Sequence, residues 1–364
     1  MLKKAKRGVE NALEMQEAEI YMNARVLRDT DGACASFLGV IRVDRSQSSG
    51  RLVSGLWLVW AFEGRYTLSS HLRSATYPRA LGLTLYRSAE VLDAFEDPEL
   101  AVAQTVMRQL LEALAQLHAA GLVHRDVKPL NLVLDEAHAR FKLIDLGACA
   151  DLRTGKNYAP DETILDPKYS PPEEFLMPID EAPNLAAASA PLALALGASA
   201  WARYQPDRFD IYSAGIILMQ LAVPSLRSDR GLKAFNEALA AVGHDLLAWR
   251  AAAALPLVQT AVLDGNEGAG WELAEALLRP RPPGWADPAG IAASVGGARS
   301  RPSAEEALAS RFLTTPAPRR LPGSKYSSAL AGQRALARLE SQMLEQSKAV
   351  RVPSSTHCSL PCRG

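Results

Sequence analysis

Apolar residues recur every three or four positions along several stretches of the chain, and this period is typical of amphipathic helices. The clearest stretch covers residues 99–120, where Val102, Val106 and Leu110 share one face and Gly121 supplies a C-terminal stop. The same spacing predicts a charged helix over residues 10–25. Further helices are expected at residues 208–218, 232–250 and 270–278.

Shorter apolar runs bounded by turn-forming residues predict β-strands. Two such runs, at residues 35–43 and 55–60, flank a Ser/Gly-rich turn and indicate a small sheet near the N-terminus. Two more, at residues 132–134 and 141–144, surround a short turn and predict a β-hairpin. This hairpin carries polar groups at both of its mouths.

The polar residues around the hairpin have complementary chemistry. They are His124, Arg125, Asp126, Lys128, Asn131 and Asp145. Together they offer a base, cations and metal ligands, and the highly charged transition state of phosphoryl transfer needs positioning and cations more than covalent chemistry. A surface hairpin with chance charges is the alternative, but it does not explain polar residues at fixed offsets followed by a second motif.

The patterns H-R-D-x-K-P-x-x-N and D-L-G resemble the catalytic domain of eukaryotic-type protein kinases, with Leu146 where phenylalanine is usual. The resemblance implies that Asp126 accepts or orients the substrate hydroxyl and that Lys128 neutralises the migrating phosphoryl group. It also implies that Asn131 and Asp145 hold the Mg²⁺ ions that bridge the phosphates of ATP. ATP and Mg²⁺ are therefore the expected cofactors.

The same resemblance implies an α+β, two-lobed fold with a small β-rich N-terminal lobe and a large helical C-terminal lobe. Residues 1–64 would then form a partial small lobe and hinge, and residues 65–314 the large lobe. Composition indicates insertions in the large lobe at about 174–206 and 279–300. Residues 315–364 are expected to be a helical and disordered tail.

The expected phosphate-pairing residues lie near the N-terminus. Lys3 would be the pairing lysine and Glu19 its helix partner, because the letters E-I-Y-M from Glu19 resemble the usual E-I-x-L. Lys4 and Glu17 are the alternatives, and an ordinary solvated helix is a competing interpretation. No glycine-rich loop precedes Lys3, so we expect either a truncated chain or a missing nucleotide lid.

The adenine-binding hinge is expected where the letters W-L-V-W-A-F-E-G end the second predicted strand. By the resemblance Trp60 occupies the gatekeeper position, and the backbones of Ala61, Phe62 and Glu63 contact adenine. A plain buried strand and turn would explain the same apolar run. A tryptophan at the gatekeeper position would restrict the pocket behind adenine.

Supporting roles are implied for several residues of the large lobe. By the resemblance Asp210 braces the backbone of the catalytic loop, and Arg301 pairs with Glu173. Ser303, with Glu306 three positions later, predicts a capping box at the start of a closing helix.

The residues beside Asp126 are expected to have structural or regulatory roles. His124 belongs to the motif, and Arg125 is the kind of cation that pairs with a phosphate added to the following segment. Asp166 stands where serine/threonine kinases usually carry a threonine, which puts the positioning of the substrate hydroxyl in doubt. The candidate phosphate acceptors are Thr154, Tyr158, Thr163 and Ser170.

Other stretches are more particular, among them L-I-D-L-G-A-C-A-D-L-R from Leu143, L-D-P-K-Y from Leu165 and P-D-R-F-D-I-Y-S from Pro206. They resemble the chloroplast state-transition kinases and the sister kinase that phosphorylates photosystem II core proteins. This resemblance implies a serine/threonine kinase at the stromal face of chloroplast thylakoids, with antenna or photosystem II core proteins as substrates. The transit peptide, membrane anchor and redox cysteine pair of that family match no residue of this chain.

Composition excludes some partners. The chain has 40 basic and 40 acidic residues, and this zero net charge does not favour a nucleic-acid partner. It contains no run of 18 apolar residues, so no membrane span is expected. Its 4 cysteines are too scattered for a disulfide framework, and Cys358 and Cys362 fit a disordered tail better than a metal or redox pair.

Two other functions compete with an active protein kinase. A silent pseudokinase or scaffold is favoured by the missing glycine-rich loop and by Asn23, a polar residue at a helix position that is usually apolar. Silent kinases commonly lose the base or a metal ligand, however, and both are present here. A small-molecule kinase of related fold is disfavoured by Glu173, Asp210 and Arg301, a trio typical of lobes that bind protein substrates.

Overall fold

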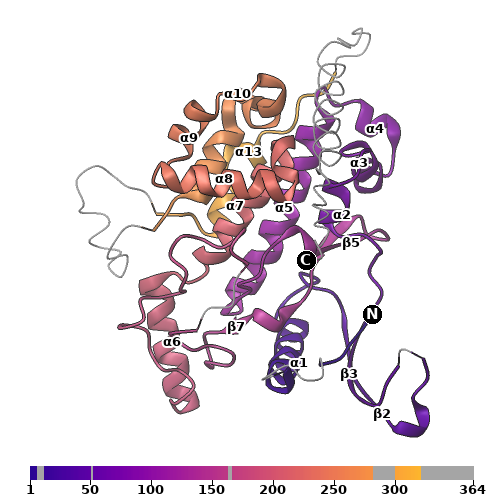
Figure 1. Ribbon diagram of the computed structural model, residues 1–364, viewed down its shortest axis with the longest axis vertical. Coiled ribbons are helices and arrows are strands. Elements are labelled where there is room, and N and C mark those ends of the chain that lie inside the picture. The colour runs from indigo at the N-terminus through magenta and orange to yellow at the C-terminus, as the bar shows by residue number, and fades with distance from the viewer. Residues whose placement is uncertain (6–11, 51, 163–165, 282–299, 321–364) are drawn as a thin grey trace, which may run out of the picture.

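The computed structural model describes residues 1–5, 12–50, 52–162, 166–281 and 300–320. The expectations for Thr163, for most of the 279–300 insertion and for nearly all of the tail fall outside these residues. Within them the chain forms a small lobe with strands and one long helix, and a large lobe made mainly of helices (Figure 1).

The small lobe is built on a three-stranded antiparallel sheet with the strand order β1–β3–β2. β1 (Leu2–Lys3) and β2 (Phe37–Val43) both pair with β3 (Gly55–Trp60), which confirms the two strands expected here. The helix α1 (Ala12–Asp29) packs beside the sheet and continues beyond the predicted end at Arg25. Its buried face includes polar residues, so α1 does more than cover an apolar sheet.

Two helices, α5 (Pro98–Ala119) and α7 (Arg208–Ala222), form the centre of the large lobe. Asp97 caps α5, and every residue of α7 after Arg208 is buried, as expected for a helix surrounded by others. Around them lie α2 (Leu68–Leu72), α3 (Arg79–Tyr86), α4 (Ala89–Asp93), α8 (Asp229–Ala241), α9 (Leu246–Ala253), α10 (Leu257–Leu278), α12 (Ala304–Leu308) and α13 (Arg311–Thr314).

The stretch expected as an irregular insertion at 174–206 contains a regular helix, α6 (Ala190–Tyr204). Alanine and leucine dominate it and are strong helix formers, and Pro191 is tolerated in the first turn. The prediction of an irregular insertion is therefore wrong here, because the helix propensity of these residues outweighs the low complexity of the stretch.

The helix boundaries later in the large lobe also differ from those expected. The helix predicted at 232–250 is two helices, α8 and α9, separated where Gly243 and His244 take left-handed φ angles of 66° and 62°. The helix predicted at 270–278 is the second part of α10, which is interrupted by non-helical residues from Gly265 to Gly268.

The predicted hairpin is present as β5 (Leu132–Asp135) and β6 (Arg140–Leu143). The short strands β4 (Leu122–Val123) and β7 (Ala150–Asp151) pair beside it. Backbone hydrogen bonds of 2.9 and 3.0 Å join Leu143 to the chain that enters β2, so the hairpin lies where the two lobes meet. The backbone also passes very close at Gly64, where a Cβ would collide with the carbonyl oxygen of Leu134.

Candidate active site

The loop between β4 and β5 brings three predicted residues together. Lys128 Nζ lies 2.8 Å from Asp126 Oδ1, and Asn131 Nδ2 donates to Asp126 Oδ2 at 2.8 Å. A 3₁₀ turn that starts at Pro129 ends at Asn131, whose amide also donates to the Asp126 carbonyl at 2.9 Å. The carboxylate, the cation and the amide expected from the sequence therefore share one small site.

Asp166 also contacts this site, since its Oδ2 lies 3.4 Å from Lys128 Nζ. Burial opposes the charge of the lysine, but the hydrogen bond and charge of Asp126, supported by Asp166, raise the pKa of Lys128. The residue that replaces the usual threonine thus supplies a second carboxylate, and Lys128 stays cationic at neutral pH.

Asp145 follows β6 and points toward the small lobe. It adopts a left-handed φ of 63°, and its Oδ1 lies 2.7 Å from Lys3 Nζ. Burial opposes ionisation, but the hydrogen bond and charge of Lys3 hold the pKa of Asp145 below its ordinary value. A Cβ on Gly147 would lie 3.3 Å from Asp145 Oδ1, so glycine keeps space open beside the carboxylate.

The structure distinguishes between the alternatives for the phosphate-pairing residues. Lys3 Nζ lies 2.9 Å from Glu19 Oε1, and burial raises the pKa of Glu19 although Lys3 partly offsets it. Lys4 instead bonds the Ser54 carbonyl, and Glu17 is exposed. Lys3 and Glu19 therefore form the ion pair, while Lys4 and Glu17 do not take part in it.

The predicted hinge follows β3. Trp60 is buried at its start, and the Ala61 amide donates to the Ser36 carbonyl at 2.9 Å. The Glu63 side chain accepts a hydrogen bond of 2.7 Å from the Ser36 amide, whereas Phe62 is 71% exposed. The segment predicted to be the hinge is thus held to Ser36 by the side chain of Glu63 as well as by its own backbone.

Comparison with known proteins identifies this arrangement. The protein kinase domain family matches residues 85–185. A crystal structure of an Stt7 homolog from Micromonas algae soaked with ATP matches with a TM-score of 0.68 at 35% sequence identity, over 86% of this chain and 84% of that one. This chain belongs to the protein kinase family.

Two curated kinases extend the likeness. The chain is 40% identical over 282 residues to the chloroplastic serine/threonine-protein kinase STN8 of Arabidopsis thaliana, over 77% of this chain and 56% of that protein. It is 41% identical over 276 residues to the chloroplastic kinase STN7 of the same plant, over 74% of this chain and 48% of that protein. The chain therefore spans about half the length of these relatives.

Asp210 of this kinase braces the loop that carries Asp126, as expected. It is fully buried, and its carboxylate accepts hydrogen bonds of 2.8 Å from the backbone amides of His124 and Arg125. His118 Nε2 lies 2.9 Å from the same carboxylate. His118 is a buried residue of α5, so this contact links α5 to the brace.

Arg125 bonds backbone carbonyls of the segment that follows Asp145. Its Nε donates to the Ala148 carbonyl at 2.5 Å, and its guanidinium donates to the Asn157 carbonyl at 2.7 Å. Only 5% of Arg125 is exposed, and burial lowers its pKa. In this structure Arg125, the cation expected to pair with a phosphate, instead bonds backbone carbonyls of the segment after Asp145.

The expected pair of Glu173 and Arg301 is present. Arg301 donates to the two carboxylate oxygens of Glu173 at 2.7 and 3.2 Å, and its side chain is fully buried. Arg281 Nε adds a third contact at 3.3 Å. Arg281 was not predicted, because it lies in a Pro/Arg-rich stretch with no motif around it.

Asn131 and Asp145 fit the Mg²⁺ ions that kinases of this family typically use, because both offer the oxygen ligands that Mg²⁺ prefers. The amide nitrogen of Asn131 donates to Asp126, so its oxygen Oδ1 is the atom that could bind a cation. The Asp145 carboxylate already binds one cation in this structure, the ammonium group of Lys3. The described residues contain no cluster of three His, Cys, Asp or Glu side chains arranged for a metal. Mg²⁺ carried by nucleotide phosphates and water needs only such a partial set.

Proposed function

We propose that this chain is a serine/threonine protein kinase that transfers the γ-phosphoryl group of ATP to thylakoid antenna or photosystem II core proteins. The observation that carries the proposal is the pair of ion-paired clusters at the lobe junction: Lys3 with Glu19 and Asp145, and Asp126 with Lys128 and Asn131. The likeness to the chloroplastic serine/threonine-protein kinases STN7 and STN8 supports a serine/threonine kinase of the chloroplast. The thylakoid substrates and the stromal face follow from the resemblance of the sequence to the state-transition kinases.

The residues divide the work of phosphoryl transfer. Lys3, oriented by Glu19, would bind the nucleotide phosphates, and the hinge backbone at Ala61–Glu63 would bind adenine. Asp126 would orient the substrate hydroxyl and take its proton, with Asn131 holding the carboxylate in place. Lys128 would offset the charge of the migrating group. Mg²⁺ on Asn131 and Asp145 would neutralise charge on the phosphates.

Asp166 sets this site apart from that of most serine/threonine kinases. Because Asp126 and Asp166 share Lys128, the lysine is held between two carboxylates. In the proposed reaction these two carboxylates keep Lys128 where the phosphoryl group meets the substrate hydroxyl. Asp166, which stands in place of the usual threonine, would thus help to position Lys128.

The test is transfer of labelled γ-phosphate from Mg-ATP to isolated thylakoid proteins. We expect labelling by the full chain, and Asp126→Asn and Asp145→Asn should each lower it at least about 100-fold, since each removes a group needed in the transition state. The exposed Asp180→Asn makes the same chemical change away from the site and should leave labelling unchanged.

The size of the labelled protein separates antenna substrates from core substrates. Equal labelling by the wild type and Asp126→Asn would contradict the proposal. It would favour instead a silent kinase that acts as a scaffold.

Described residues contain no helix long and apolar enough to cross a membrane.

A further inference from the structure

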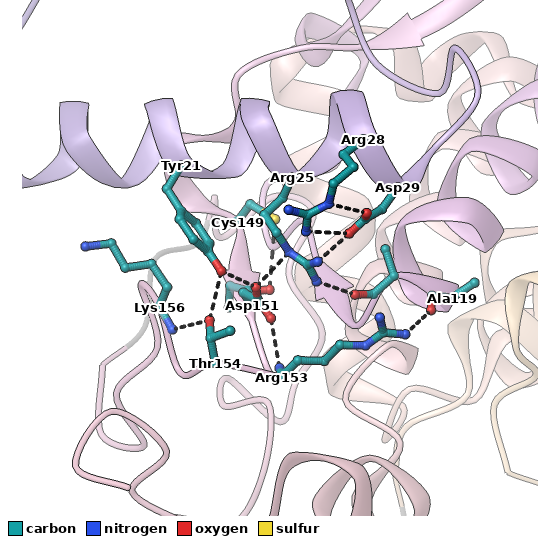
Figure 2. Close-up of polar contacts among 12 residues, drawn as sticks. Tyr21, Arg25, Arg28, Asp29, Ala119, Cys149, Asp151, Arg153, Thr154 and Lys156 are labelled. Atoms are coloured by element: carbon teal, nitrogen blue, oxygen red, sulfur yellow. Dashed lines mark hydrogen bonds and ion pairs between the residues drawn. The ribbon is translucent and has the colours of Figure 1, made fainter. Parts of the chain in front are cut away.

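Among the contacts of the helix α1 with the segment after Asp145 is a buried carboxylate, that of Asp151 on β7 (Figure 2). Asp151 is fully buried, and its Oδ2 accepts from Arg25 Nε at 3.0 Å and from Tyr21 Oη at 2.8 Å. Its Oδ1 accepts from the Arg153 amide at 2.8 Å. Both oxygens are therefore bonded, and two of the three donors come from one face of α1.

Arg25 joins three parts of the molecule. Besides Asp151, its guanidinium donates to the Ala120 carbonyl at the end of α5 at 3.0 Å and bonds Asp29 on α1. Tyr21, one turn earlier on the helix, also lies 3.2 Å from Thr154 Oγ1. Figure 2 shows Tyr21 and Arg25 pointing from α1 toward Asp151, while Arg28 turns to Asp29.

A buried ion pair of this kind strongly restricts the position of α1. Removing one partner of a buried ion pair leaves the other charge without compensation in a region of low dielectric, which costs much more than losing a surface pair. Glu19 lies on the same helix just before Tyr21, so any movement of α1 away from β7 also moves Glu19 relative to Lys3.

We propose that Asp151, Arg25 and Tyr21 form a latch that fixes α1 so that Glu19 keeps Lys3 in place for the nucleotide. The inference rests on the proposed function, in which Lys3 binds phosphate, and makes the three latch residues positioning residues. The anion that anchors α1 is a carboxylate of the chain itself, and Arg125 bonds carbonyls, so the latch requires no phosphate on the segment.

Opening the latch should weaken nucleotide binding more than it slows transfer. When the competent arrangement is only partly populated, the apparent affinity falls by that fraction, and bound nucleotide restores the arrangement. We expect Arg25→Gln and Asp151→Asn to raise KM for ATP about fivefold or more and to change kcat by less than about twofold. The double variant should have the same KM for ATP as the single variant that binds ATP more weakly, because both substitutions remove the same contact.

The matched control is Arg28→Gln on the same helix, whose side chain is 67% exposed and pairs with Asp29. It should leave KM and kcat unchanged. Arg25→Lys keeps the charge but not the fork of donors that reaches both Asp151 and Ala120, so it should recover only part of the affinity.

Hydrogen–deuterium exchange of the full chain without nucleotide tests the latch independently of catalysis. Exchange in α1 should rise in Arg25→Gln and Asp151→Asn and stay at the wild-type level in Arg28→Gln. If the wild type transfers no phosphate, the proposed function fails, while exchange and the affinity for a fluorescent ADP analogue still test the latch. The latch would be overturned if the variants left both the exchange of α1 and the nucleotide affinity unchanged. It would also be overturned if only kcat fell, in proportion to a loss of folded protein.

Discussion

Asn23 and Trp60 illustrate how single residues adapt the site. The Asn23 side chain accepts a hydrogen bond of 2.8 Å from Trp60 Nε1 and donates one of 2.7 Å to the Glu19 carbonyl, and all of these groups are buried. A buried indole needs an acceptor for its N–H. The polar residue at a usually apolar helix position is therefore the partner of the predicted gatekeeper tryptophan, and it no longer favours a silent kinase.

Replacing Asn23 tests this pairing. Asn23→Leu should lower the free energy of unfolding by about 1–3 kcal/mol, because it leaves the Trp60 N–H buried without an acceptor. Urea denaturation followed by circular dichroism measures the change. In the Trp60→Phe background, which has no indole N–H, the same substitution should cost clearly less. Equal costs in both backgrounds would show that the hydrogen bond contributes nothing.

At the scale of elements, the β5–β6 hairpin is tied to the hinge by one lysine. Lys142 on β6 lies 2.7 Å from Glu63 and 2.9 Å from Asp135, and all three side chains are largely buried. His138 adds a contact of 2.8 Å to Asp135. The hairpin that carries Asp145 is thus connected to the segment expected to bind adenine.

The acid stability of the kinase should report this connection. Burial opposes ionisation of Asp135, but hydrogen bonds from Lys142 and His138 lower its pKa from 3.8 to about 2. Because the folded state binds the proton more weakly, the carboxylate stabilises the fold above about pH 4, and this stabilisation is lost as pH falls toward 2. Asp135→Asn should therefore flatten the loss of stability between about pH 5 and 2.

Urea denaturation at several pH values measures that slope. Glu136→Gln is the control, since Glu136 is exposed on the same turn, and its curve should follow the wild type. An Asp135→Asn curve parallel to the wild-type curve would contradict the assignment of the low pKa to this contact.

At the scale of the whole molecule, two buried carboxylates hold distant segments around the site. Asp210 on α7 joins the 124–131 loop to α5 through His118. Glu173 joins the end of the segment after Asp145 to Arg281 and Arg301, which lie on either side of the 282–299 stretch. The position of the site therefore depends on contacts far from it in the chain.

Removing the charge of Glu173 should be costly. Glu173→Gln leaves two buried guanidinium groups with weaker partners, so we expect the free energy of unfolding to fall by about 3 kcal/mol or more. Thermal and urea denaturation measure it, and Lys233→Gln, which disrupts an exposed pair with Glu237, should have little effect. A Glu173→Gln protein as stable as the wild type would show that this cluster does not hold the lobe together.

Elements whose residues are set by short-range sequence patterns were predicted well, and elements that depend on longer-range context were not. The strands at 35–43 and 55–60, the α5 helix and the β5–β6 hairpin follow from short-range periodicity and were found with small boundary errors. α6 was missed because its alanine-rich composition resembled a low-complexity connection. The break between α8 and α9 was missed because a continuous apolar period concealed the turn at Gly243.

The latch residues were missed for a different reason. Tyr21 and Arg25 have the four-residue spacing of neighbours on a helix, but that spacing also occurs in ordinary surface pairs. What distinguishes them is burial against Asp151, which lies 126 positions after Arg25 in the chain.

The sequence by itself determined the residues of the 124–131 loop, because residues a few positions apart are placed by local geometry, and its motifs implied the two-lobed fold through their resemblance to protein kinases. Only the tertiary structure decided between Lys3 and Lys4 and brought Lys3 to Asp145, which is 142 positions away. It alone showed that Asp166 shares Lys128, that Asn23 serves Trp60 and that Asp151 anchors α1. Such contacts depend on how elements pack against one another, and one-dimensional spacing carries no information on that packing.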